Sequence, residues 1–197
     1  MLHLFNLREI IHVLGYPGIF AMIFAESGLF FCFFLPGASL LFTTGILASS
    51  GYLNIWIVIP LVAVAAILGD SIGYWSGAYV GVRFFLKKDT RWFKHSYIEQ
   101  AKEFYDQHGA LAIILARFIP IVRTFAPIVA GVVRMPYRIF LAYNVIGAFL
   151  WAGGIVFIGY YLGVHVPFVE QYLTLIVIGI IIVTTFPVLY KIWARKS

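Results

Sequence analysis

Four ionisable residues lie inside apolar stretches of this sequence, namely Glu26, Asp70, Arg117 and Arg123. A charged side chain at the centre of a bilayer costs about 2.5–3.5 kcal/mol or more on insertion scales, and such residues mark substrate pathways or proton relays by default. Two acids and two bases can neutralise one another if the segments that carry them converge. These residues are therefore the first candidates for a functional site.

The stretch from Arg117 to Thr124 places two arginines and Pro120 in an otherwise apolar run. Because proline removes a helical hydrogen bond, we expect the segment to break there. Broken backbone is tolerated at membrane depth where it lines a polar cavity, and not against lipid. Unpaired N–H groups at the break, the Thr124 hydroxyl and the guanidiniums of Arg117 and Arg123 would suit an anionic phosphate, to which arginine offers two parallel donors.

The two acids, Glu26 and Asp70, allow two interpretations. A carboxylic acid at membrane depth can carry a proton, since loss of hydration disfavours the charged form, and this permits proton coupling or gating. Alternatively, the acids and arginines form buried ion pairs that only hold the segments together. One set of charges can do both.

Composition places the chain among integral membrane proteins. Of its 197 residues, 62% are hydrophobic and 11% are charged, whereas a soluble domain has about 25% charged residues. The length suits a single domain, residues 1–197. The net charge of +6 comes from basic residues that cluster mostly outside the apolar runs. They are interpreted as topology signals, and nucleic acid is not expected as a partner.

The apolar pattern divides the chain into three kinds of segment. Two have the capping and amphipathic pattern of interfacial helices, two are apolar but interrupted, and three are long enough to span about 30 Å of hydrocarbon. The amphipathic helices are expected at residues 6–14 and 96–108, and the interrupted apolar segments at residues 18–50 and 110–134. The segments long enough to span the membrane are residues 55–82, 139–163 and 168–190. The expected hairpin breaks are Pro36 and Gly37 in the first interrupted segment, and Pro120 and Pro127 in the second.

An internal repeat relates the two interrupted segments. Residues 18–26 align without gaps to residues 109–117, and the same offset brings a proline of each segment into register. The last aligned residues, Glu26 and Arg117, are therefore equivalent positions. Matched glycines and prolines, together with the shared order of elements, favour a true repeat over chance similarity of apolar segments.

The distribution of basic residues predicts the orientation of the repeats. The polar loop at 83–95 and the C-terminus are rich in Lys and Arg, so both should be cytoplasmic. Two clear spans and one broken segment lie between them, so the broken segment must re-enter. Repeat 1 (about 6–82) and repeat 2 (about 96–163) are then inverted. The predicted fold is an all-α polytopic membrane protein with two inverted repeats, each a re-entrant helical hairpin plus a transmembrane helix, and a C-terminal transmembrane helix at 168–190.

Other polar and aromatic residues fit structural roles. Glycines recur every fourth residue around Asp70 and predict close helix packing: Gly69, Gly73, Gly77 and Gly81. Trp151, like most other tryptophans, is interpreted as an interface anchor or packing group. The five histidines are scattered without the spacing of a metal site, and no metal or cofactor is predicted. Asn144 lies inside a span, where it can form a hydrogen bond between helices.

Several motifs together resemble the DedA family, also called SNARE-associated or VTT-domain membrane proteins. They are Glu26-Ser-Gly28, Leu35-Pro-Gly-Ala-Ser-Leu-Leu41, Gly69-Asp-Ser-Ile-Gly-Tyr-Trp-Ser-Gly77, and Ala116-Arg-Phe-Ile-Pro-Ile-Val-Arg-Thr124 followed by Pro127 and Ala130-Gly131. The resemblance covers nearly the whole chain. Its most specific part is the Arg-Phe-x-Pro-x-x-Arg-Thr element.

The resemblance implies a bacterial inner-membrane protein that returns polyprenyl-phosphate carriers, chiefly undecaprenyl phosphate, across the membrane. It also implies two facing re-entrant hairpins. Family roles carry over to Arg117 and Arg123 as phosphate contacts, and to Glu26 as a proton-coupling or gating acid. Members often have an acid after the Pro-Gly of the first hairpin, where this chain has Ala38. A two-acid coupling scheme therefore does not transfer directly.

The predicted function is a flippase whose partners are membrane lipids, with proton coupling permitted by the buried acids. Alternatives within transport are a phospholipid scramblase, as in eukaryotic relatives, and a proton-coupled exchanger of small ions or drugs. An enzyme such as a lipid phosphatase is disfavoured, because no histidine stands near the arginines as a nucleophile and no acidic cluster suits a metal. A non-transporting scaffold is a further alternative, and assembly into a homo-oligomer stays open.

Overall fold

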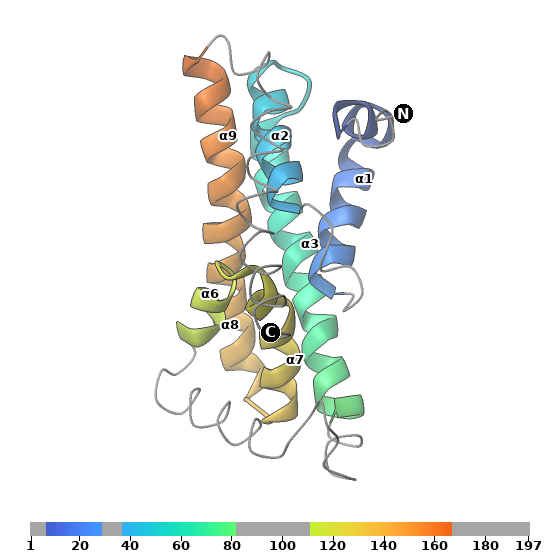
Figure 1. The fold of residues 1–197 in the computed structure, drawn as a ribbon, viewed down its shortest axis with the longest axis vertical. Helices are drawn as coiled ribbons and strands as arrows, with labels where there is room; N and C mark the ends of the chain where they lie inside the picture. Colours follow the sequence, from blue (N-terminus) through green and yellow to red (C-terminus); the bar gives the residue numbers. More distant parts are fainter. Residues whose placement is uncertain (1–6, 29–36, 82–110, 167–197) are drawn as a thin grey trace, which may run out of the picture. The chain divides into compact units, whose positions relative to one another are not determined.

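The computed structural model describes residues 7–28, 37–81 and 111–166. This described part of the chain is helical and contains no strand (Figure 1). In chain order its helices are α1 (Leu7–Gly28), α2 (Gly37–Ser49), α3 (Ile55–Ser76), η3 (Gly77–Gly81), α6 (Leu111–Ala116), α7 (Pro120–Val132), α8 (Tyr137–Ala148), η4 (Phe149–Gly153) and α9 (Gly154–His165), where η marks a π-helical turn. The all-α prediction is confirmed for these residues.

Two continuous helical stretches within the described residues are long and apolar enough to cross a membrane. They are Ile55–Tyr79, with 25 residues, and Tyr137–His165, with 29 residues. At 1.5 Å per residue each exceeds a hydrocarbon core of about 30 Å. They agree with the spans predicted at 55–82 and 139–163. Along α3, large apolar side chains at helical spacing stay exposed and are available for contact with lipid: Val64, Leu68, Ile72 and Trp75.

Of the two segments expected to be broken, the second is interrupted within the described residues. Helix α1 ends at Gly28 and α2 begins at Gly37, while the residues between them, Pro36 included, lie outside the described part. Helix α6 ends at Ala116 and α7 begins at Pro120. Proline is well suited to the first position of a helix, because the N–H group it lacks would have no helical acceptor there. The predicted break at Pro120 is confirmed.

Pro127 was expected to break its segment as well, and this prediction is wrong. Helix α7 continues through Pro127 to Val132. The helix packs against the end of α3, and a Cβ at Gly73 would lie 3.3 Å from the Pro127 side chain. This packing keeps the helix continuous, although the missing proline N–H leaves the Arg123 carbonyl without its helical donor.

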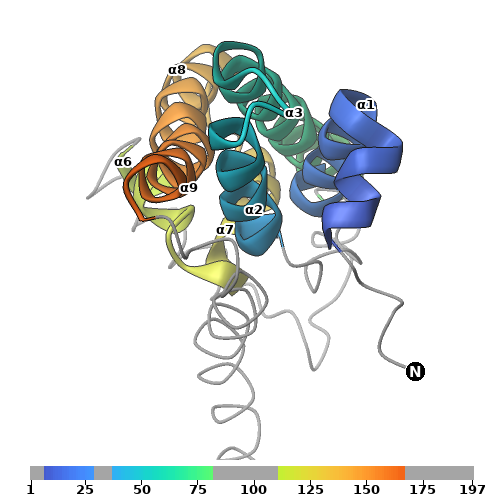
Figure 2. The same ribbon diagram turned by 90° about the horizontal axis from the view of Figure 1, so that it is seen from above.

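The chain divides into two compact units, and α2 pairs with α9 in the first of them (Figures 1 and 2). The pairing depends on glycine. A Cβ at Gly45 would overlap the backbone of Val156, and one at Gly159 would overlap the backbone of Phe42. The two helix backbones can approach this closely only because neither glycine carries a side chain.

The second unit contains most of α3 together with α6, α7 and α8. Here Gly69 lies against the end of α1, and Gly77 lies against the backbone of Ile128 in α7. The packing role predicted for the glycines around Asp70 is thus confirmed at these positions. A buried cluster ties the helices of this unit together: Tyr74, Ile113, Ala130 and Phe140.

The helix expected at 6–14 agrees with the structure, in which α1 begins at Leu7 and leaves helical geometry at Gly15, with φ 54° and ψ −146°. Glycine adopts this conformation without the clash of a Cβ. The basic loop at 83–95, the helix at 96–108 and the span at 168–190 lie outside the described residues, so these remain predictions.

We predict that Gly159→Ala destabilises the protein by about 1–3 kcal/mol, because the new methyl group must push α9 away from α2. Gly154→Ala, on the same helix, is the matched control, since nothing lies within 4 Å of a Cβ there. It should leave stability unchanged or raise it by about 0.5–1 kcal/mol through helix propensity. Equilibrium unfolding in mixed micelles measures both, and equal effects would contradict the close α2–α9 contact.

Candidate functional site

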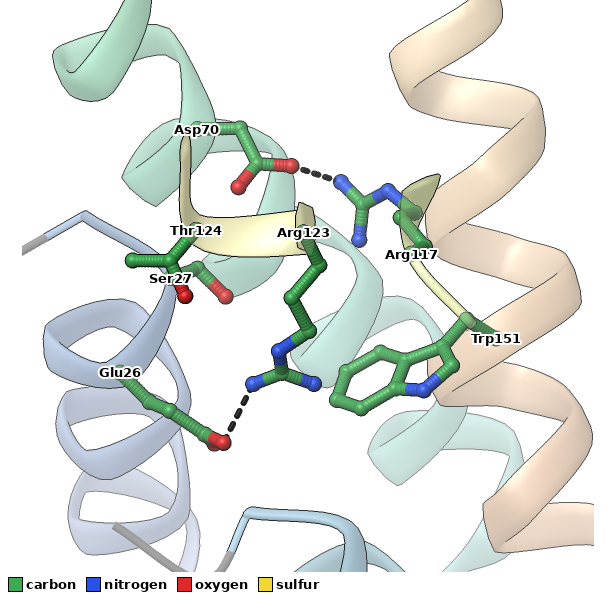
Figure 3. A pocket seen from close by; sticks show the side chains of 7 residues that line it. All are labelled: Glu26, Ser27, Asp70, Arg117, Arg123, Thr124 and Trp151. Atoms are coloured by element: carbon green, nitrogen blue, oxygen red, sulfur yellow. Dashed lines mark hydrogen bonds and ion pairs between the residues drawn. The ribbon is translucent and has the colours of Figure 1, made fainter. Parts of the chain in front are cut away.

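The four charged residues singled out from the sequence meet in the second unit (Figure 3). Glu26 comes from the end of α1, Asp70 from α3, Arg117 from the break before α7, and Arg123 from the first turn of α7. Glu26, Asp70 and Arg117 are each less than a tenth exposed, and the Arg123 side chain is 13% exposed. Charges this deeply buried require partners, and the structure supplies one to each.

Arg117 is held by two acceptors on two different helices. Its Nη2 donates to Asp70 Oδ2 of α3 and, at 2.5 Å, to Asn144 Oδ1 of α8. Asn144 is itself oriented by a hydrogen bond from its Nδ2 to the Ile67 carbonyl at 3.3 Å. Gly147 leaves room for the arginine, because a Cβ there would lie 2.9 Å from Arg117 Cδ. The prediction that Asn144 bonds between helices is confirmed.

The guanidinium group of Arg123 has a different environment. A carboxylate lies at the edge of the guanidinium plane, and an aromatic ring covers the face of that plane. Its Nη2 forms an ion pair with Glu26 Oε1. Its guanidinium carbon lies 4.1 Å from the centroid of the Trp151 ring, which is within the range of a cation–π contact (Figure 3). Trp151 is 7% exposed. It is thus a buried packing group of the site, which is one of the two roles predicted for it, and not an interface anchor.

Part of the backbone at the break is already hydrogen-bonded. The N–H groups of Arg117, Phe118 and Ile119 donate to carbonyls three residues earlier, at 3.1 to 3.2 Å. Pro120, the next residue, has no N–H group. Turns with this three-residue spacing satisfy carbonyl groups at the end of α6 that would otherwise lack donors. These three N–H groups are therefore already used, and the backbone donors at the break are those in the first turn of α7, after Pro120.

Seven residues line a pocket of about 240 Å³, a volume that includes its open mouth: Glu26, Ser27, Asp70, Arg117, Arg123, Thr124 and Trp151. Sequence reasoning identified five of them and missed Ser27 and Trp151. Ser27 directly follows Glu26. Trp151 stands seven residues after Asn144, which is about two helical turns and indicates a shared helix face. In both cases the sequence signal was the spacing from a residue already singled out, Glu26 for Ser27 and Asn144 for Trp151.

The remaining predicted residues do not line this pocket. Gly37 begins α2 in the first unit, Pro36 lies outside the described residues, and Pro127 lies within α7 against α3. Within the described residues, no group of three or more His, Cys, Asp or Glu side chains is placed to hold a metal ion.

Two apolar helices long enough to cross a bilayer, one of which carries the buried and paired Asp70, are consistent with a helical membrane protein. Comparison with known proteins agrees. A model of the VTT domain matches residues 35–161. Protein DedA of Escherichia coli (strain K12) is 43% identical over 97% of this chain and 89% of its own length. An uncharacterized membrane protein of Mycobacterium leprae is 46% identical over 90% of this chain and 79% of its own.

More distantly, inner membrane protein YghB of Escherichia coli (strain K12) is 34% identical over 78% of this chain and 70% of its own length. No solved structure matches the chain significantly. The chain belongs to the DedA family of VTT-domain membrane proteins. The resemblance drawn from its motifs is confirmed.

We predict strong coupling between Asp70 and Arg117 in a double-mutant cycle. Arg117→Met leaves a carboxylate buried without its cation, and loss of one member of a buried pair costs about 3–5 kcal/mol. Adding Asp70→Asn should restore part of that loss, so the double variant should be less destabilised than the sum of the two single variants. Free energies of unfolding in mixed micelles provide the measurement.

The matched control combines Arg117→Met with Glu26→Gln, since Glu26 pairs with the other arginine. These two changes should come closer to additive. Equal coupling in the two cycles would show that the four charges act as one undivided cluster and would contradict the pairing described above.

Proposed function

We propose that this protein is a flippase for a polyprenyl-phosphate lipid carrier, with undecaprenyl phosphate as the first candidate. The observation that carries the proposal is the buried Arg123 in the wall of a pocket that also contains Ser27 and Thr124. A guanidinium and two hydroxyl groups are good donors to phosphate oxygens. In an apolar protein they can receive a headgroup while an isoprenoid tail stays in lipid.

Binding of a phosphate requires an exchange, because the guanidinium of Arg123 already faces Glu26. The two acids and two arginines sum to zero charge. If a phosphate monoanion takes Arg123 while Glu26 takes up a proton, the sum is again zero, with two arginines against Asp70 and the phosphate. Such an exchange avoids an uncompensated charge at membrane depth, and it gives Glu26 the proton-coupling or gating role.

Arg117 and Asp70 have a more static part in this scheme. Arg117 is held by both Asp70 and Asn144, so it contributes positive charge to the pocket without leaving its partners. Asp70 supplies the second acid of the cluster, and position 38 of this chain is alanine. We propose that Arg117 supports the phosphate through its field and that Arg123 makes the exchangeable contact.

The proposal includes a topology. The two broken segments would re-enter the bacterial cytoplasmic (inner) membrane from opposite sides as the hairpins of two inverted repeats, with the loop at 83–95 and the C-terminus in the cytoplasm. The basic residues of that loop support this orientation. The name of the relative YghB, an inner membrane protein, supports the choice of membrane.

Cysteine labelling tests the topology. Cys32 is the only cysteine of the sequence, so Cys32→Ser gives a cysteine-free background. In intact cells a membrane-impermeant thiol reagent should label Tyr52→Cys, in the turn after α2, and should leave Arg134→Cys unlabelled until the membrane is opened. Both native side chains are exposed. Labelling of both positions from one side would contradict the inverted arrangement.

Transport by purified protein in liposomes tests the function. Wild-type protein should speed the movement of labelled undecaprenyl phosphate between leaflets, and Arg123→Ala should reduce the rate at least about tenfold, because loss of a charge-assisted contact costs about 1.5–3 kcal/mol. Arg138→Ala is the matched control, since Arg138 is exposed and lies outside the pocket, and it should stay active.

A wild-type rate no faster than that of Arg123→Ala would contradict the proposal. Competition by phospholipids with other headgroups at equal strength would instead identify a scramblase. An imposed pH gradient that changes the wild-type rate, but not the rate of Glu26→Gln, would assign the proton to Glu26.

A further inference from the structure

Trp151 is the one aromatic residue that lines the pocket within the described residues, and neither the motifs nor the ion pairs account for it. It lies in the π-helical turn η4 between α8 and α9. Its neighbours Phe149 and Leu150 are about half exposed, whereas Trp151 is buried. A π-helical turn shifts the faces of the residues it contains, and such turns are frequent at functional sites.

The contacts of the two arginines differ in a way that Trp151 explains. Arg117 is held through the edge of its guanidinium by Asp70 and Asn144. Within the described residues, Arg123 has a single carboxylate at its edge, and the Trp151 ring covers its face at 4.1 Å. A cation–π contact uses the face of the guanidinium plane and leaves the in-plane N–H donors to other acceptors.

We propose that Trp151 is a positioning residue for an exchangeable arginine. It holds Arg123 by its face, so that the N–H edge can pass from Glu26 to a phosphate oxygen of the ligand without the side chain leaving the pocket. A second polar partner would fix the edge instead, as Asn144 does for Arg117, and would hinder the exchange. This inference rests on the proposed phosphate-binding function and adds a specificity element to it.

The proposal predicts how the contact depends on the electron density of the Trp151 ring. The attraction between a cation and an aromatic face is electrostatic, so it weakens as the π-system loses electron density, even when ring shape is kept. A contact of this kind is worth about 0.5–2 kcal/mol, which corresponds to about a two- to thirtyfold change in affinity. If Trp151 only packed against Arg123, the affinity for the ligand would not depend on the electron density of the ring.

The experiment replaces Trp151 in the full chain by tryptophan carrying one, two or three fluorine atoms, and measures undecaprenyl phosphate transport in liposomes against lipid concentration. We expect the half-saturating concentration to rise stepwise with fluorination, by about two- to thirtyfold in total, while the maximal rate changes less. The same series at Trp56, which is 82% exposed, is the matched control and should be flat. In an Arg123→Gln background the series at Trp151 should also be flat.

A flat series at Trp151 in an otherwise active protein would overturn the positioning role and leave the transport function standing. An equal trend at Trp56, or a trend that persists without Arg123, would overturn it as well. If the wild-type protein moves no undecaprenyl phosphate, the proposed function and this inference fail together. Trp151→Phe, which keeps a smaller π-face, should lie between wild type and Trp151→Leu.

Discussion

The rest of the structure depends on one electrostatic constraint, which is that charges inside an apolar protein must be paired. A buried carboxylate or guanidinium without a partner costs several kcal/mol, and lipid offers no water to reduce that cost. Here each acid meets an arginine from the other half of the chain, Asp70 with Arg117 and Glu26 with Arg123. The helices of the second unit must therefore come close enough for both ion pairs to form together.

Glycine allows this approach. The backbone of α3 lies directly against the end of α1 at Gly69, one residue before the buried acid, and the backbone of η3 lies against α7 at Gly77, seven residues after it. Any side chain at these positions would hold the helices apart and would lengthen both ion pairs. In this protein the small residues and the charged residues are parts of one arrangement, because close packing is what makes the pairing of the charges possible.

The sequence alone predicts the elements and the charged residues well, since a charge or a proline in a long apolar run is conspicuous. It does not predict the pairing. Repeat symmetry relates Glu26 to Arg117, yet each has another partner in the structure. Pro127 carries a breaking signal that packing against α3 overrides. The sequence predicts Trp151 as an interface anchor or packing group without placing it in the pocket, because its orientation also depends on the π-helical turn that contains it.

Arg117 and Arg123 differ in how firmly they are held, because they differ in their partners among the described residues. Arg117 bonds to an acid and an amide on separate helices, so moving it would break two polar contacts and leave Asn144 short of a donor. Arg123 has one carboxylate and one aromatic face, and a proton on Glu26 would remove the charge that holds its edge. Under the proposed function the site must both keep its shape and release a ligand, and one fixed and one exchangeable cation meet these two requirements. Two equally anchored arginines would bind an anion poorly, because neither could leave its partner, and two weakly held ones would not keep the helices together.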